Sequence, residues 1–402
     1  MERLLGATRI CVAFFCVLQA AWCCGQGTNT TAILNSILRD YDRRLRPNDT
    51  GSPVSVKINV YIESMEGIRE STMDFAITMY FRMFWRDPRL SFEGNQTIIF
   101  KSGDMDNLWI PDVVFLYEKQ AKVHTVTQIN RLLRVQPDGN VASSSRVSAT
   151  LSCNMMLQQF PMDRQKCTIV MSSYAYSTRD VILYVEEGSI QIEPGITIPK
   201  FSLTGSEFSN EEAIYLLGNY STPKFHFYFM RQTESYFLTV YIPTMVLVSI
   251  AWLSFWIDAK AAPARVALGI TTVLTVTTMT AGIQETLPVV TYAKAIDIWL
   301  AVCLLFVFFS LLEFGMANYL LVVQTRREKS LAGDIEQSPA KEMERNLQIE
   351  TVGDGGRCCS SLWTANRLDC VARWAYPAAF LVFNAFYWIY FLAFNKANAK
   401  QH

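Results

Sequence analysis

Histidine is scarce in this chain, and neither sign of charge is in excess. Only His124, His226 and His402 occur among 402 residues, and 36 Lys and Arg balance 36 Asp and Glu. No histidine keeps zinc-ligand spacing with a cysteine pair, and no glycine-rich phosphate loop is present. We therefore expect no enzyme, no metal site, no cofactor and no nucleic-acid partner.

Long apolar runs are missing between residues 28 and 235 but recur after that point. Four later segments are long enough to cross a bilayer as helices, namely Tyr236–Ile257, Ala262–Thr278, Ile296–Val323 and Val371–Phe394. The sequence therefore predicts a large soluble domain followed by a four-helix transmembrane bundle.

The N-terminus has the pattern of a secretory signal. Arg3 and Arg9 precede the apolar run Ile10–Trp22, and small residues follow it. A signal anchor is the alternative, although the run is short for a membrane span. We predict five regions: a signal peptide over residues 1–25, an extracellular domain over 26–234, three spans over 235–323, a cytoplasmic segment over 324–370, and a fourth span with an extracellular C-terminus over 371–402.

Export to an oxidising compartment explains two further features of the soluble domain. It contains acceptor sequons for N-glycosylation at Asn29, Asn48, Asn95 and Asn219. After removal of the signal, only Cys153 and Cys167 remain in it, and we expect them to pair. The disulfide would add roughly 3 kcal/mol by restricting the unfolded chain.

The soluble domain is predicted to be an all-β, immunoglobulin-like sandwich. Polar and apolar residues alternate in Val54–Ile62, and similar patterns follow in Asp74–Trp85, Val141–Leu151 and Cys167–Met171. One helix is expected before the strands, over Thr30–Arg43, with Ile33, Leu34, Ile37, Leu38 and Tyr41 on its apolar face.

The second apolar segment is unusually polar for a membrane span. Thr271, Leu274, Thr275 and Thr278 share one helical face. Lipid cannot satisfy hydroxyl groups, so this face is expected to meet water or another helix. The alternative is a buried bundle helix whose threonines bond to neighbouring helices.

Several motifs together resemble the Cys-loop pentameric ligand-gated ion channels. Cys153 and Cys167 enclose Phe160-Pro161-Met162-Asp163, and the second span begins with Pro263-Ala264-Arg265. The other motifs are Trp85-x-Asp87-Pro88-Arg89-Leu90, Trp109-x-Pro111-Asp112 and Lys294-Ala295-Ile296-Asp297-Ile298-Trp299. The resemblance covers residues 30–325 and the fourth span. It points to the anion-selective glycine and GABA-A receptor branch, as an invertebrate-like or orphan glycine-receptor-like subunit.

The resemblance implies a chloride channel of five identical or related subunits in the plasma membrane, surrounded by lipid. A synaptic location is a further expectation. The second span would line the pore with rings formed by Ala267, Thr271, Leu274 and Thr278, and Leu274 would be the hydrophobic gate. Arg265 would place a ring of positive charge at the inner mouth. Ala264 stands where cation-selective relatives carry glutamate, while Glu285 is expected near the outer mouth.

The resemblance also places a small-molecule agonist between subunits. One subunit would supply aromatic side chains and loop hydroxyls, and the next an arginine that holds a carboxylate. The residues of the first subunit would be Phe115, Ser172, Tyr174, Tyr220, Thr222 and Phe225, and those of the second Tyr80, Arg82 and Ser144. Ser172 replaces a glutamate of glycine receptors, and the second disulfide of those receptors is absent. An orphan or heteromer-only subunit, with another ligand, is therefore the alternative.

Five residues match positions that couple ligand binding to the pore in this family: Glu70, Asp163, Arg231, Pro288 and Lys294. Arg231 would lie in an acidic cluster with Glu70 and Asp163. The loop Phe160–Asp163 would press on the linker Glu285–Lys294, which Pro288 shapes. Closure around the agonist would then shift these contacts and tilt the second span.

Overall fold

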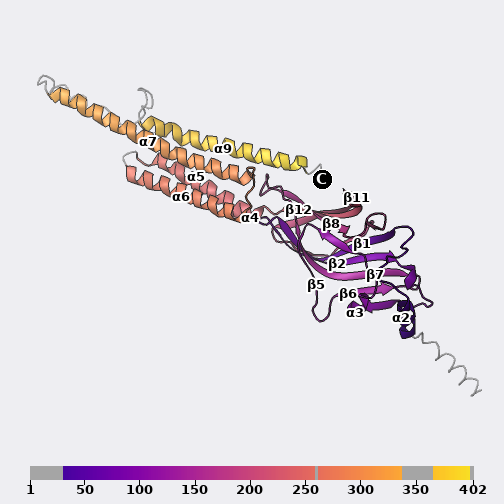
Figure 1. Cartoon of the computed structure of the whole chain (residues 1–402). Coiled ribbons are helices and arrows are strands. Elements are labelled where there is room, and N and C mark those ends of the chain that lie inside the picture. The colour runs from indigo at the N-terminus through magenta and orange to yellow at the C-terminus, as the bar shows by residue number, and fades with distance from the viewer. Residues whose placement is uncertain (1–29, 259–260, 337–364, 399–402) are drawn as a thin grey trace, which may run out of the picture.

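The chain folds into a β-sandwich at one end and a helical bundle at the other (Figure 1). The computed structural model describes residues 30–258, 261–336 and 365–398. The predicted signal peptide, Asn29 and most of the predicted cytoplasmic segment lie outside these residues. A β-sandwich in two sheets followed by a helical membrane region confirms the predicted fold class.

The first sheet has eight strands in the order β10-β1-β2-β7-β6-β3, with β9 also pairing β1 and β5 also pairing β7. Their bounds are β1 Val54–Arg69, β2 Asp74–Arg86, β3 Ile98–Lys101, β5 Glu118–Val123, β6 Arg131–Val135, β7 Asn140–Ser152, β9 Val181–Tyr184 and β10 Ile190–Ile192. The second sheet runs β11-β12-β8-β4. Its strands are β4 Val113–Leu116, β8 Arg164–Ser173, β11 Phe201–Tyr215 and β12 Gly218–Arg231.

Alternation along the strands builds the core between the two sheets. In β2, Phe81, Met83 and Trp85 are buried, whereas Phe84 and Arg86 between and beside them are exposed. Successive side chains of a strand point to opposite faces, so one face packs and the other is free. Each large apolar side chain buried in this way contributes about 1.5–3 kcal/mol.

The predicted disulfide between Cys153 and Cys167 is present. Cys153 directly follows β7 of the first sheet, and Cys167 lies within β8 of the second sheet. The bond therefore ties the two sheets together beside the loop that contains Phe160-Pro161-Met162-Asp163.

The N-terminal helix is shorter than predicted. The helix α2 spans Thr30–Arg39 and therefore ends before Tyr41. Instead, the Tyr41 hydroxyl donates to Asp87 Oδ2 at 2.7 Å and accepts from the Trp109 N–H at 3.2 Å. These side-chain hydrogen bonds attach Tyr41 to the sandwich beyond the end of the helix.

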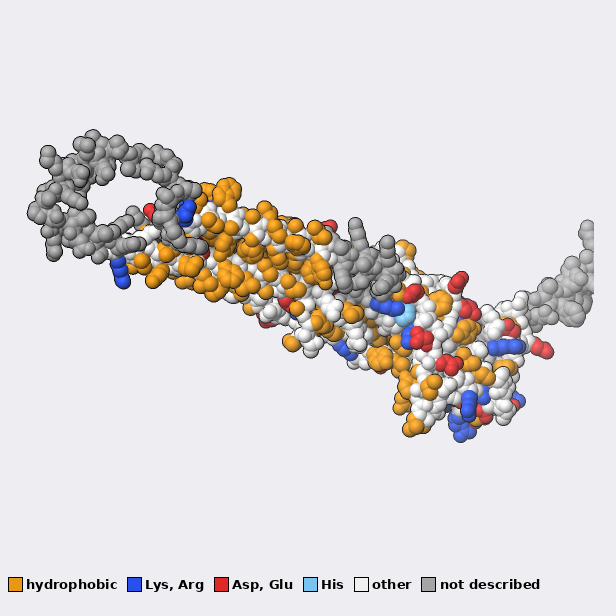
Figure 2. Space-filling model, turned by 90° about the horizontal axis from the view of Figure 1, so that it is seen from above, with side chains coloured by type: hydrophobic (Ala, Val, Ile, Leu, Met, Phe, Trp, Pro, Cys, Tyr) orange, Lys and Arg blue, Asp and Glu red, His pale blue; other side chains and the backbone are white. Residues whose placement is uncertain are grey.

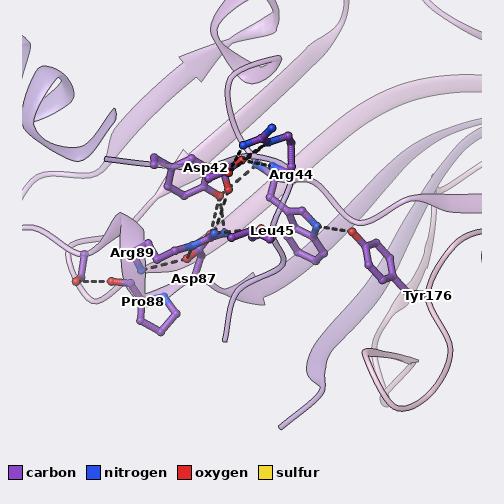
Figure 3. A network of polar contacts seen from close by, with 10 residues as sticks. Asp42, Arg44, Leu45, Asp87, Pro88, Arg89 and Tyr176 are labelled. Carbon is purple, nitrogen blue, oxygen red and sulfur yellow. Dashed lines mark hydrogen bonds and ion pairs between the residues drawn. The ribbon is translucent and has the colours of Figure 1, made fainter. Parts of the chain in front are cut away.

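Asp87 is the centre of the polar network in Figure 3. It precedes the short helix η1 (Pro88–Leu90) and has no exposed surface. Arg89 donates to its carboxylate from Nε at 2.9 Å and from Nη2 at 2.8 Å. The Arg89 Nη1 also donates to the Leu45 carbonyl at 3.0 Å, so the network fastens the N-terminal segment to the sandwich.

We predict that Asp87→Asn lowers the stability of the protein by about 3 kcal/mol, because hydrogen bonds to a buried charge are lost. Thermal unfolding of the purified full-length protein, followed by size-exclusion chromatography, measures this. Asp42→Asn is the matched control in the same network, since Asp42 pairs with Arg44, whose side chain is 83% exposed. Equal effects of the two substitutions would contradict the central role of Asp87.

The bundle is built from helices that run side by side (Figure 1). The first span consists of α4 Glu234–Tyr236, η2 Phe237–Tyr241, α5 Ile242–Leu253 and η3 Ser254–Trp256. It is followed by α6 Ala262–Thr286, α7 Ala295–Glu336 and α9 Ala365–Asn398, while the short α3 Ser102–Met105 lies in the sandwich. Within the described residues, three helices are long and apolar enough to cross a membrane: Glu234–Trp256, Ala262–Thr286 and Ala295–Arg326. The helix α9, at the predicted fourth span, packs against α7 and α5.

Aromatic and hydroxyl side chains hold α9 to the other helices near the sandwich. The hydroxyls of Tyr241 and Tyr387 lie 2.8 Å apart, and the Tyr387 hydroxyl also bonds to the Ala295 carbonyl at 3.1 Å. Trp299 is fully buried among them, and its Nε1 donates to Thr244 Oγ1 at 2.9 Å. The outer surface of the bundle is mainly hydrophobic, whereas charged side chains gather on the sandwich (Figure 2).

Candidate functional site

Arg231, the last residue of β12, is buried between two carboxylates at the junction of sandwich and bundle. Its Nε donates to Asp163 Oδ1 at 2.7 Å, and its Nη2 donates to Asp163 Oδ2 at 3.0 Å. Its Nη1 donates to Glu70 Oε1, and its side chain has no exposed surface. The structure thus brings together the three residues that were predicted to form a cluster here.

Aromatic rings close the rest of this cluster. The guanidinium carbon of Arg231 lies 4.6 Å from the Phe160 ring centre and 4.4 Å from the Phe201 ring centre. Burial alone would lower the pKa of Arg231, but hydrogen bonds and charges from Asp163 and Glu70 outweigh it, and the pKa is raised. The cation therefore stays charged inside the junction.

The loop that carries Asp163 also contacts the segment between α6 and α7. The Ala295 N–H donates to the Gln158 carbonyl at 2.9 Å, and the Ile296 N–H donates to the Phe160 carbonyl at 3.2 Å. The Tyr292 hydroxyl accepts from the Leu157 N–H at 2.9 Å. One loop therefore touches both the Arg231 cluster and the connection between the second and third membrane helices.

Two further residues of the predicted coupling set lie in or beside this connection. Pro288 is half-buried between α6 and α7. Lys294 is buried, and its Nζ lies 3.4 Å from Asp297 Oδ2 on the first turn of α7. Lys294 therefore bonds within its own helix start, while the loop contacts fall on Tyr292, Ala295 and Ile296.

For the ligand-gated channel that the sequence motifs resemble, we predict that Arg231→Ala reduces agonist-evoked current at least tenfold at equal surface expression. The substitution leaves Asp163 and Glu70 buried without their cation, and breaking a buried pair costs about 3–5 kcal/mol. Voltage clamp combined with surface biotinylation measures both quantities. Arg164→Ala is the control, because Arg164 is exposed and adjacent to Asp163 in sequence. Undiminished current in Arg231→Ala would remove the cluster from the gating mechanism.

The helix α6 carries two opposite stripes of residues. Arg265, Gly269, Thr272 and Val276 are buried inside the subunit. Gly269 lies so close to α7 that a Cβ there would come within 2.5 Å of a Leu311 methyl carbon. The absence of a side chain thus allows these two helices to pack tightly.

The opposite stripe of α6 faces away from the subunit and contains Ala267, Thr271, Leu274 and Thr278. Leu274 is 61% exposed. Thr271 donates to the Ala267 carbonyl at 2.8 Å, and Thr278 donates to the Thr275 carbonyl at 2.9 Å. These hydroxyls bond to carbonyls of their own helix. Within the described residues, the threonines of the stripe therefore do not bond to neighbouring helices of the same subunit.

Arg265 does not belong to the exposed stripe, and its predicted position at the pore mouth is wrong. Its side chain is fully buried, and its Nη1 and Nη2 donate to the Asp369 carboxylate of α9 at 3.1 and 2.6 Å. Its Nε donates to the Ile257 carbonyl at 3.0 Å. The guanidinium points into the subunit because the Asp369 carboxylate and the Ile257 carbonyl accept its hydrogen bonds there. Arg265 thus connects the start of α6 to α9 and to the end of the first span.

We predict that Asp369→Asn lowers the thermal stability of the detergent-solubilised receptor, because removing one partner of a buried ion pair costs about 3–5 kcal/mol. The midpoint of thermal unfolding of the purified protein is the measurement. Asp297→Asn serves as control, since Asp297 is 26% exposed where it faces Lys294. A midpoint that moves no further in Asp369→Asn than in Asp297→Asn would contradict the structural role of the Arg265 pair.

On the outer face of the first sheet, Tyr80, Arg82 and Ser144 line one hollow of about 630 Å³. Arg82 of β2 lies directly opposite Ser144 of β7 in the antiparallel register. The guanidinium carbon of Arg82 lies 5.6 Å from the Tyr61 ring centre, and its Nη1 lies 3.4 Å from Asn59 Oδ1. The predicted carboxylate-holding pair is therefore half-buried, with both side chains lining one hollow of the outer face.

The aromatic residues predicted for the other face lie on or beside the second sheet. Tyr174 is 81% exposed on the loop after β8, and Tyr220 packs edge-on against Tyr215 near the β11–β12 turn. Phe115 of β4 packs edge-on against Phe81 of the first sheet. A single subunit does not bring Tyr174 and Tyr220 to the Arg82 hollow, so a joint site requires two subunits.

Three of the predicted ligand residues are buried instead of facing a ligand. Phe225 has no exposed surface, because it alternates with Phe227 and Phe229 on the core face of β12. Ser172 and Thr222 are each 4% exposed, and the Ser172 hydroxyl donates to the Ser173 carbonyl at 3.2 Å. Of the predicted aromatic ligand residues beside the second sheet, Tyr174 is exposed and Tyr220 is half-buried, whereas Phe225 is a core residue.

Two further arginines line this hollow that the sequence analysis did not predict. Arg134 of β6 and Arg146 of β7 line it together with Arg82. Arg146 pairs with Glu63 at 2.7 Å, whereas Arg134 is exposed. Their alternation with apolar Leu133 and Val147 was the available signal, since it places both on the outer face.

Three of the four sequon asparagines lie in the described residues, and all three are exposed: Asn48, Asn95 and Asn219. Asn219 lies beside Tyr220 at the β11–β12 turn. Glycosylation at these positions stays a prediction.

A β-sandwich fixed by buried charges to membrane-spanning helices defines a membrane receptor whose outer domain can act on its spans. Residues 30–233 match the neurotransmitter-gated ion-channel ligand binding domain, and residues 240–354 match the neurotransmitter-gated ion-channel transmembrane region. The chain belongs to the neurotransmitter-gated ion channels. Members of this family are channels and not enzymes, and they assemble as pentamers that respond to small-molecule agonists.

Proposed function

We propose that this chain is a subunit of a chloride-conducting pentamer, opened by a small amino-acid-like ligand between subunits. The observation that carries the ligand class is the half-buried pair Arg82 and Ser144, which line one hollow. A guanidinium holds a carboxylate through paired hydrogen bonds, and a hydroxyl adds a third. The exposed Tyr174 and the half-buried Tyr220 of the neighbouring subunit would supply the rings for the ammonium end.

The exposed stripe of α6 supports anion selectivity. Pro263 and Ala264 are exposed at the N-terminal end of the helix, where the backbone dipole is positive. No acidic residue occurs in α6 before Glu285, near its other end. Since Arg265 is paired with Asp369 inside the subunit, selectivity rests on the absent acid and the helix terminus and not on a ring of arginines.

Leu274 is the residue proposed as the gate. Five copies of an exposed leucine around a narrow axis would repel water and stop ions until α6 tilts. Ala267 and Thr271 would form the narrower part towards the cytoplasm, and Thr278 the part above the gate. The receptor would act in the plasma membrane, including at synapses.

Ser172 favours a second candidate, an orphan or heteromer-only subunit with a ligand other than glycine or GABA. It is buried and uncharged at the position where glycine receptors carry a glutamate, so the ligand ammonium lacks a charged partner there. A subunit of this kind would need a neighbour of another type to complete the site.

We predict that Arg82→Lys raises the agonist concentration for half-maximal current roughly 10- to 100-fold, because charged hydrogen bonds of about 1.5–3 kcal/mol are lost. Two-electrode voltage clamp of oocytes expressing the chain alone is the measurement, with glycine, GABA, β-alanine and taurine. Arg44→Lys is the control, since Arg44 is 83% exposed and far from the hollow along the chain.

The same recordings test selectivity. A reversal potential that follows external chloride supports the proposal, and one that follows sodium overturns it. Silence of the single subunit at normal surface expression, followed by current on co-expression with a glycine-receptor subunit, would establish the heteromeric alternative.

A further inference from the structure

We propose that the outer face of the first sheet carries a second anion-binding site that takes an aromatic carboxylate. It lies beside the hollow lined by Tyr80, Arg82 and Ser144, which we call the agonist hollow. This site is a hollow of about 710 Å³ farther along β2. We call it the upper hollow and define it by Lys57, Phe84, Arg86, Ile99, Arg134 and Tyr184 among its lining residues. The inference goes beyond the proposed gating function and does not depend on it.

The upper hollow exists because β7 carries small side chains between two strands with large ones. β7 lies between β2 and β6 in the sheet. Its outward-facing floor consists of Asn140, Ala142 and Ser144, while Phe84 and Arg86 rise from β2. A trough therefore runs along β7, and Phe84 borders both the agonist hollow and the upper hollow.

Positive charge in the upper hollow is incompletely neutralised. Arg86 and Arg134 are exposed, and neither has an ion-pair partner within the part of the chain that the structure describes. Lys57 does pair, with Glu186 at 2.5 Å. No acidic side chain lines the hollow itself. Two guanidiniums in a concave site without an acid favour an anion, which they can hold by charge-assisted hydrogen bonds.

Apolar surface in the same hollow favours a ring on that anion. Phe84 is 38% exposed and Ile99 is 59% exposed, and they come from separate strands of the lining. Tyr184, at the end of β9, adds a second aromatic side chain. Aromatic rings stack or meet edge-on at centroid distances of about 4.5–7 Å, and the volume lies in the range of small-molecule sites.

Arg134 lines both hollows, but one small ligand cannot reach both of the β2 arginines that distinguish them. Arg82 and Arg86 lie four residues apart on the same face of β2. A strand advances about 3.4 Å per residue, so their backbones are about 14 Å apart. Benzoate is much shorter than this distance, so one molecule could occupy only one of the two hollows.

The test uses the purified full-length receptor, with benzoate as probe and saturation-transfer NMR as readout. We expect benzoate to bind with a dissociation constant on the order of 1 mM. Neutral benzamide, of the same shape, should bind at least tenfold more weakly, because a carboxylate gains charged hydrogen bonds that an amide cannot make.

Two matched variants locate the binding. Arg86→Gln removes a cation of the upper hollow and should weaken benzoate binding roughly tenfold or more. Arg82→Gln removes a cation of the agonist hollow, about 14 Å away along β2, and should weaken benzoate binding less than Arg86→Gln does. Both variants should elute as the wild-type assembly, and Phe84→Ala should weaken benzoate more than acetate.

Three results would overturn the proposal: equal binding of benzamide and benzoate, loss of benzoate binding in Arg82→Gln but not in Arg86→Gln, or no benzoate signal at 10-fold the expected dissociation constant, roughly 10 mM. The last result would mean that a neighbouring subunit fills the hollow. None of these results depends on channel opening, so failure here leaves the proposed function intact.

Discussion

The structure depends on keeping one cation, Arg231, charged in a place without water. A single guanidinium there would be expelled or neutralised, but Asp163 and Glu70 bind it from two different segments of the sandwich. Because Asp163 belongs to the disulfide-closed loop, the ion pair also fixes that loop, which in turn bonds to the backbone of Ala295 and Ile296. The sandwich, the first span and the start of α7 are thus connected by one network of bonds. A displacement of any one of them changes the contacts of the other two.

The residues proposed to bind the ligand lie on two different sheets, so the proposed site requires assembly of subunits. Arg82 and Ser144 lie on the outer face of the first sheet, while Tyr174 and Tyr220 lie at the far end of the second. If the proposed ligand site is right, a lone subunit would present its carboxylate-binding residues and its aromatic residues too far apart to hold one ligand. Placing five copies in a ring, as the family does, lets each subunit use both halves. The small side chains of β7 leave the space that the ligand needs, and the same feature opens the hollow next to it.

Much of this arrangement could be predicted from the sequence, for identifiable reasons. Strand alternation, such as that of Val54–Ile62, reports burial directly, and the cysteine pair follows from the compartment. Tyr41 was misjudged because helical spacing alone cannot reveal that Asp87, far along the chain, will accept its hydroxyl. Phe225 was misjudged because the parity of β12 assigns it to the core with Phe227 and Phe229. The Tyr41 error concerns a partner that only the tertiary fold supplies, whereas the alternation of Phe225, Phe227 and Phe229 is present in the sequence.

Arg265 shows how such a partner changes a functional argument. A basic residue at the start of a pore helix is expected to attract anions, but its guanidinium is neutralised by Asp369 and held by the Ile257 carbonyl. What remains at the exposed N-terminal end of α6 is a helix terminus with Pro263 and Ala264 and no carboxylate. In the proposed channel, anions would be favoured by the partial positive charge of the helix terminus, worth about half an elementary charge per subunit. Arg265 contributes by fixing the base of α6 to α9, and so sets where that terminus lies.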